Sequence, residues 1–225
     1  MNNTVELLGH YGSDEVHALS AWTSTSRDLD EQKKERIPAL LKMLAENGHE
    51  TPFEKSSLHF LVNVDQATHI HLLKHRIGVS VNGESARYKE LKEDKMYLPD
   101  DWNLPIEEFT DPHSTITFVK GQTWNEVLEG EVKIMNNLYH EALKQLTPVL
   151  GRKRAKESAR FFKTMNSQIT MDIMFNFRSF NHFYNLRASD HAQVEVRDVA
   201  NQMLELVKGI EGNPFEHTLK AFKLT

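Results

Sequence analysis

Cations, hydroxyl groups, an amide and a carboxylate are concentrated between His75 and Tyr88, in the segment HRIGVSVNGESARY. Arginine presents a planar fork of donors that matches phosphate oxygens, and serine hydroxyls and glycine-exposed backbone amides add short hydrogen bonds. Lys74 places a third cation directly before His75 and Arg76. These residue types and their spacing predict a binding site for an anionic, phosphorylated ligand.

Two further polar clusters lie before and after this segment. The first covers residues 48–54, GHETPFE, and the second covers residues 176–187, NFRSFNHFYNLR, followed by DHAQ at 190–193. Residues three and four apart are neighbours on a helix, so a helix here places Arg178, Asn181 or His182, and Asn185 along one face. The chain therefore carries three candidate parts of a site, far apart in sequence.

Composition limits the chemistry available to the chain. It has 225 residues, a net charge of −5 and no cysteine, which excludes disulfides, zinc-thiolate sites, iron-sulfur clusters and a cysteine nucleophile. The negative charge argues against a broad nucleic-acid surface. The N-terminus lacks a signal-peptide pattern, and no apolar run approaches the roughly 20 residues of a membrane span. We expect one soluble, cytoplasmic domain without nucleic-acid or membrane partners.

Hydrophobic periodicity predicts the elements that must position the clusters. Residues 57–64 and 169–175 are expected as strands, and the segment from His75 to Tyr88 begins where a short helix over 65–75, capped by Asp65, ends. Further helices are expected at 14–24, 30–47, 122–146, 152–162, 178–186, 191–208 and 214–221. Few strands, well separated among many helices, indicate an α+β domain with a central, mostly antiparallel sheet flanked by helices.

An aromatic stripe runs along residues 175–184, at Phe175, Phe177, Phe180, Phe183 and Tyr184. Such rings could stack on a flat ligand. Aromatic stripes at helical spacing more often fill a core, so we expect them to be buried.

The three clusters together resemble the flavin-dependent thymidylate synthases, whose hallmark begins Arg-His-Arg and continues with spaced Ser, Ser and Arg. This chain has Lys74-His75-Arg76, then Ser80, Ser85 and Arg87. The resemblance extends, in the family's order, to GHETPFE, Asn176-x-Arg178-Ser179, Leu186-Arg187 and His191-Ala192-Gln193-x-Glu195. Two departures are a lysine at position 74 and one extra residue between Arg76 and Ser80, where Gly78 can absorb a bulge.

The resemblance implies that residues 1–225 form one family domain, a homotetramer with active sites between subunits. It implies reductive methylation of dUMP to dTMP, with methylenetetrahydrofolate as carbon donor and NADPH-reduced FAD as hydride source. Arg187 is implied as the catalytic residue that activates the uracil ring, without a metal. The implied FAD residues are Ser24, His49, Thr51, Glu54, Lys74, His75, Arg76, Glu84, Asn176, Arg178, His182 and His191. The implied dUMP residues are His71, Lys74, Gly83, Glu84, Ser85, Ala86, Arg87, Arg160 and Arg187.

The absence of cysteine excludes the other class of thymidylate synthase, which attacks uracil with a cysteine thiolate. A nucleophilic Ser85 would need an adjacent base, so phosphate binding is its simpler role. Two alternatives remain open. One is a noncatalytic dUMP- or flavin-binding protein, motivated by Lys74 and the extra residue. The other is a metal-dependent hydrolase using His69, His71 and His75, although no carboxylate pair accompanies them.

Overall fold

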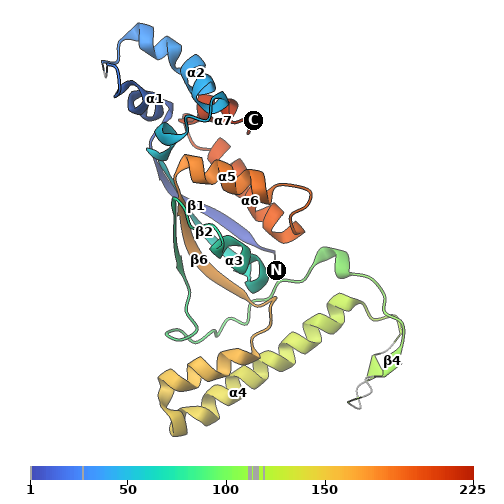
Figure 1. Ribbon diagram of the computed structural model, residues 1–225. Coiled ribbons are helices and arrows are strands. Elements are labelled where there is room, and N and C mark those ends of the chain that lie inside the picture. Colours follow the sequence, from blue (N-terminus) through green and yellow to red (C-terminus); the bar gives the residue numbers. More distant parts are fainter. Residues whose placement is uncertain (1, 27, 111–112, 114–116, 119) are drawn as a thin grey trace. The chain divides into compact units, whose positions relative to one another are not determined.

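The computed structural model describes residues 2–26, 28–110, 113, 117–118 and 120–225. The chain divides into two compact units, which are described separately because their relative placement is not determined (Figure 1). The larger unit comprises Thr4–Asn63, Ile70–Gly83 and Thr170–Thr225, and the smaller comprises Met1–Asn3, Val64–His69 and Glu84–Ile169. The expectation of a single family domain over 1–225 stays a prediction.

A four-stranded sheet forms the centre of the larger unit, in the order β1 (Thr4–Tyr11), β2 (Ser57–Asp65), β6 (Gln168–Phe175) and β3 (Val79–Gly83). The β1–β2 and β3–β6 pairs are antiparallel. Along β2, Leu58, Phe60, Val62 and Val64 are fully buried, whereas the residues between them are partly exposed. This alternation predicted the strand, because successive side chains point to opposite faces.

Helices around this sheet begin where polar side chains cap them. The N-cap side chains of Ser13, Asp30 and Asn176 accept hydrogen bonds from backbone amides in the first turns of α1, α2 and α5. The amphipathic α6 contacts β1 and α5, and α7 packs on α2 (Figure 1). The bounds are α1 (Asp14–Trp22), α2 (Glu31–Glu46), η1 (Thr51–Glu54), α5 (Phe177–Arg187), α6 (Val194–Lys208) and α7 (Glu216–Ala221).

The aromatic stripe belongs to the core of the larger unit. Phe175, Phe177, Phe180 and Phe183 are fully buried, and the Phe175 ring lies 5.0 Å from the Phe183 ring. Burial of such large rings dominates core stability. The prediction that the stripe fills the core is confirmed for the four phenylalanines, whereas Tyr184 is partly exposed and lies outside the core.

The smaller unit contains the long helix α4 (Trp124–Ala159), which starts at a capping box formed by Thr123 and Glu126. Gly151 interrupts it with a non-helical backbone, φ 77° and ψ 152°, so two helices meet there, as the sequence predicted. Tyr139, Leu143, Ala155 and Ala159 from both arms form a buried cluster. The remaining elements of this unit are η2 (Asp100–Trp102), η3 (Arg160–Phe162), β4 (Phe109–Thr110) and β5 (Thr117–Phe118), and α3 (Gln66–Leu73) has residues in both units.

The α+β class and the antiparallel pairing therefore agree with the expectation. Asp65 caps α3 as predicted, since its Oδ1 atom accepts from the Thr68 amide at 2.8 Å. Strands β1 and β3 were not predicted. Within the described part of the chain, no helix combines the length and apolar character needed to cross a bilayer.

Candidate active site

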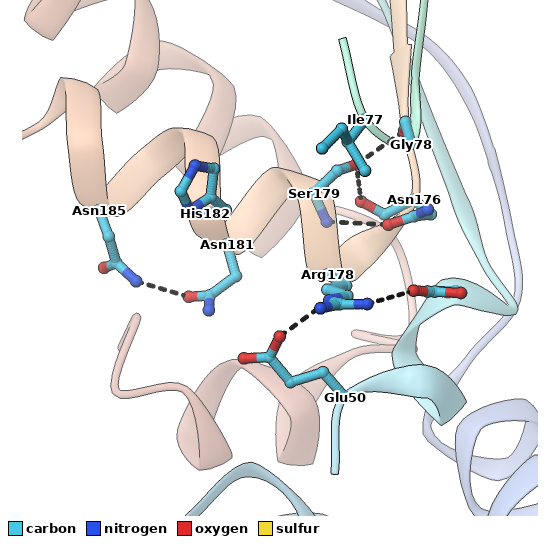
Figure 2. A pocket seen from close by; sticks show the side chains of 10 residues that line it. Glu50, Ile77, Gly78, Asn176, Arg178, Ser179, Asn181, His182 and Asn185 are labelled. Atoms are coloured by element: carbon cyan, nitrogen blue, oxygen red, sulfur yellow. Dashed lines mark hydrogen bonds and ion pairs between the residues drawn. The ribbon is translucent and has the colours of Figure 1, made fainter. Parts of the chain in front are cut away.

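A cavity of about 520 Å³ lies within the larger unit and brings residues of all three polar clusters together (Figure 2). The segment around η1, the turn before β3 and one face of α5 form its walls. A cavity of this size accommodates a substantial part of a cofactor. Its lining residues are Glu50, Glu54, Ile77, Gly78, Asn176, Arg178, Ser179, Asn181, His182 and Asn185.

Arg178 is held between two carboxylates at this cavity. Its Nε atom donates to Glu50 at 2.8 Å and its Nη1 atom donates to Glu54 at 2.6 Å, as Figure 2 shows for the labelled Glu50. These bonds, that to Glu54 most strongly, raise the pKa of Arg178 above its ordinary value. Its side chain is 48% exposed, so the pairs add little stability. They instead fix the orientation of the guanidinium group.

The N-terminus of α5 is fastened to the turn at Gly78. The Gly78 carbonyl oxygen accepts from the Ser179 hydroxyl at 2.8 Å and from the Asn176 amide at 3.2 Å. Gly78 has φ +68°, and a Cβ atom there would lie 2.6 Å from Asn176 Nδ2. Only glycine fits this close approach without displacing the cap. Asn176, Arg178 and Ser179, at the start of α5, line the cavity. The positive end of the helix dipole thus lies at the cavity, where it favours an anionic group.

The exposed face of α5 confirms the helical spacing predicted from sequence. Arg178, Asn181, His182 and Asn185 all line the cavity, and Asn185 Nδ2 donates to Asn181 Oδ1 at 3.1 Å (Figure 2). The buried face of the same helix carries the phenylalanines of the core. One helix thus supplies both the core packing and a polar wall.

Arg187, at the end of α5, contacts two histidines from the hallmark region. Its Nε atom donates to His75 Nε2 at 2.9 Å, and its Nη2 atom donates to the His71 carbonyl oxygen at 3.3 Å. Because arginine can only donate, His75 Nε2 must accept and Nδ1 must carry the proton. Burial first, and then the charges of Arg187 and His182, lower the pKa of His75 to about 4. His75 is therefore neutral at pH 7, and Arg187 is the cation here.

The hydroxyl and arginine groups expected for a phosphate lie in the smaller unit. The backbone amide of Arg87 donates to Ser85 Oγ at 3.3 Å, and its Nε atom donates to Glu157 at 2.9 Å. The bond from Arg87 is the main cause that lowers the pKa of Glu157. Glu84 pairs with Lys89 at 2.6 Å, and Arg160 is exposed at the start of η3. Glu157 was not predicted, since its partner lies 70 residues away.

The other candidate residues fall in different places. Ser24 is exposed after α1 and donates to the Ala21 carbonyl oxygen at 3.0 Å. His49, Thr51, Lys74, Arg76 and His191 are exposed, Gly83 ends β3, and Ala86 is partly buried. Of the predicted FAD residues, the cavity lining contains Glu54, Asn176, Arg178 and His182. Glu50 was quoted in its cluster without a role, and Ile77, 91% exposed, was not singled out.

No metal-binding group of three His, Cys, Asp or Glu side chains occurs among the residues with described placement. In the larger unit, His75 Nε2 accepts from Arg187, and the His71 ring contacts Arg187 Nη1 at 3.4 Å and Gln193 Oε1 at 3.1 Å. A hydrolase that depends on these histidines as metal ligands has no geometric support.

Comparison with known proteins identifies the chain's relatives. A family model described as "Thymidylate synthase complementing protein" matches residues 6–211. The chain is 31% identical over 208 residues to the flavin-dependent thymidylate synthase of Streptomyces avermitilis, covering 91% of this chain and 82% of that protein. It is also 31% identical over 204 residues to the enzyme of that name from Thermosipho africanus, covering 91% and 85%.

A solved structure with a similar fold has a related description. The UMP/dUMP methylase PolB of Streptomyces cacaoi, bound with 5-Br dUMP, superposes with a TM-score of 0.76 at 27% identity, over 99% of this chain and 95% of that one. These relatives define a class of methyltransferases of dTMP biosynthesis, as the sequence predicted. The chain belongs to the thymidylate synthase complementing protein family.

Proposed function

We propose that this protein is a flavin-dependent thymidylate synthase that reductively methylates dUMP to dTMP. Methylenetetrahydrofolate would supply the carbon, and NADPH would supply the electrons through FAD. The observation that carries the proposal is the cavity lined by Glu54, Gly78 and Arg178, among others, which joins the three clusters of the family pattern. Curated relatives named flavin-dependent thymidylate synthase support the cofactor.

The residues of this cavity fit a flavin nucleotide. Arg178 would exchange its bond to Glu50 for a diphosphate group, and the first turn of α5 supplies the positive end of a helix dipole, which suits such a group. The exposed Ile77 offers an apolar surface for a ring. Glu54, Asn176, Arg178 and His182 would hold FAD, and His49, Thr51 and Arg76 lie beside lining residues in sequence. FAD, once bound and reduced, supplies a hydride.

The remaining expected residues would bind the nucleotide. Ser85 and Arg87 would hold the phosphate dianion with Arg160, because hydroxyl and guanidinium donors match its oxygens. Arg87 would exchange its bond to Glu157 for the ligand. Arg187 would stabilise negative charge that develops on the uracil ring, while the neutral His75 fixes its guanidinium. With no cysteine in the chain, ring activation would depend on this cation.

The proposal includes a cytoplasmic homotetramer with active sites between subunits. Support comes from large apolar side chains exposed on α4 of a single chain, including Ile134 at 51%, Leu138 at 44% and Val149 at 79%. Contiguous exposed apolar surface is typical of subunit interfaces. The molar mass in solution, measured by light scattering, tests this part.

UMP is a second candidate substrate, because the structural neighbours are named a UMP/dUMP methylase, one bound with 5-Br UMP. Purified protein should be yellow, lose its flavin absorbance on addition of NADPH, and convert dUMP to dTMP in the complete mixture. Parallel assays that compare turnover of UMP and dUMP show whether the protein prefers ribose or deoxyribose in its substrate. Arg187→Ala should abolish product formation, whereas Arg36→Ala, an exposed arginine on α2, should not. A colourless protein that gains no flavin from added FAD would overturn the proposal.

A further inference from the structure

A buried chain of four polar side chains lies in the larger unit, and none of the four has a role in the function proposed for the site. It links Asp14 and His17 of α1 to Ser56 before β2 and Thr218 of α7. His17 and Thr218 are fully buried, Ser56 is 5% exposed and Asp14 is 7% exposed. Burial of a polar group is costly unless it is hydrogen-bonded, and each of these four side chains has a hydrogen-bond partner among the others.

In this chain of polar side chains, the donor and the acceptor of each hydrogen bond can be assigned. Asp14 Oδ1 accepts from the Thr218 hydroxyl at 2.6 Å and from the Thr218 amide at 2.8 Å. The Thr218 oxygen must therefore accept from His17 Nδ1–H, which lies 2.9 Å away. His17 Nε2 then accepts from the Ser56 hydroxyl at 2.8 Å, while the competing Phe53 carbonyl oxygen is 3.5 Å from that hydroxyl. One tautomer of neutral His17 satisfies every bond.

The His17 ring also contacts the two residues that precede the central ion pair of the cavity. Its centroid lies 5.3 Å from the Phe53 ring and 5.8 Å from the Phe177 ring, both in edge-to-face arrangements. Phe53 is followed by Glu54, and Phe177 is followed by Arg178. The His17 ring therefore packs against both segments, at Phe53 and at Phe177. The 2.6 Å bond between Glu54 and Arg178 joins the same two segments one residue further along each of them.

We propose that His17 is a positioning residue for the cavity, which, through Ser56 and the rings of Phe53 and Phe177, sets the placement of Glu54 against Arg178. The role rests on the proposed function, in which this cavity binds FAD. Burial lowers the pKa of His17 to about 4, so the ring stays neutral and able to accept from Ser56 near pH 7. Gly12 packs tightly on Ser56, because a Cβ atom on Gly12 would lie 2.7 Å from Ser56 Cβ.

Two conservative variants test the bond of His17 to Ser56 separately from its bond to Thr218. In His17→Gln, the longer amide reaches the position of Nε2 and can accept from Ser56. In His17→Asn, the amide nitrogen occupies the position of Nδ1 and can donate to Thr218 only. If placement of η1 is what matters, glutamine rescues the cavity and asparagine does not. If His17 contributed only to overall stability, FAD affinity would not be retained in His17→Gln and lost in His17→Asn.

The experiment measures the FAD dissociation constant and the dUMP KM and kcat of the full-length protein. We expect His17→Ala, His17→Asn and Ser56→Ala to weaken FAD binding about tenfold, since each leaves a buried group unsatisfied at the cavity side. His17→Gln should stay near wild type, and all should keep the dUMP KM. Val199→Ala, a fully buried site on α6, controls for lost stability and should keep FAD affinity.

The outcomes are distinct for the two proposals. Wild type that binds no FAD would overturn the proposed function, and the positioning role with it. Wild type that binds FAD, together with unchanged affinity in His17→Asn and Ser56→Ala, would overturn the positioning role alone. If His17→Ala does not fold, Ser56→Ala and Thr218→Ser decide the question, because serine keeps the hydroxyl and should keep FAD affinity.

Discussion

Substitution of Gly78 by alanine tests how closely the turn before β3 must approach α5. Gly78 has φ +68°, and an added Cβ atom would meet Asn176 Nδ2 at 2.6 Å and Ser179 Cβ at 3.2 Å. Asn176 caps α5 by accepting from the Ser179 amide at 2.8 Å. Gly78→Ala therefore strains the backbone and displaces the cap of the helix that lines the cavity.

The expected cost has two parts. A left-handed conformation costs a residue with a Cβ atom about 1 kcal/mol relative to glycine. Loss of an N-cap costs about 1 kcal/mol more, so Gly78→Ala should lower the free energy of unfolding by about 2 kcal/mol. Gly212→Ala is a matched control, because Gly212 has φ +75° and nothing lies within 4 Å of its added Cβ atom. The control should lose only about 1 kcal/mol.

Urea unfolding gives the free energy of each variant, and fluorescence titration gives its affinity for FAD. Gly78→Ala should bind FAD at least tenfold more weakly than wild type, whereas Gly212→Ala should bind it normally. Equal losses of stability in the two variants, together with equal FAD affinity, would refute the argument that Gly78 fixes the cap at Asn176.

Three further predictions concern charge. Arg187→Ala should lower kcat for dTMP formation by about 10² to 10³ while FAD still binds, and near-normal turnover would remove its activating role. Burial lowers the pKa of both His17 and His75 from 6.5 to about 4. Between these values the unfolded chain binds more protons, so the free energy of unfolding should fall with falling pH, by up to about 3 kcal/mol for each histidine. His17→Gln should flatten this profile in urea titrations at a series of pH values, and an unchanged slope would contradict the assignment. Lys74→Arg should tighten FAD binding if the missing planar fork limits it, and an unchanged dissociation constant would show that it does not.

The elements with a strong local signal could be predicted from the sequence. Asp65 capped its helix as expected, and the alternation along β2 identified a half-buried strand. Strands β1 and β3 were missed because both lie at the edges of the sheet and carry mostly exposed or partly exposed residues. Both strands alternate between exposed and partly exposed residues, and they lack the fully buried positions that marked β2.

The site was predicted in its parts and not in its geometry. The clusters around Glu54 and Arg178 were identified, and the face of α5 followed from helical spacing. The ion pair between Glu50 and Arg178 spans 128 residues, and no local pattern specifies such a contact. The tautomer of His75 likewise depends on Arg187, which only the fold brings to 2.9 Å.

A single-turnover experiment tests the central claim most directly. The protein is loaded with FAD, reduced with NADPH without oxygen, and freed of excess NADPH. Addition of dUMP and methylenetetrahydrofolate together should reoxidise the flavin and yield dTMP in proportion to the flavin, and neither substrate alone should yield dTMP. Flavin that stays reduced in the complete mixture, with no dTMP formed, would contradict the account.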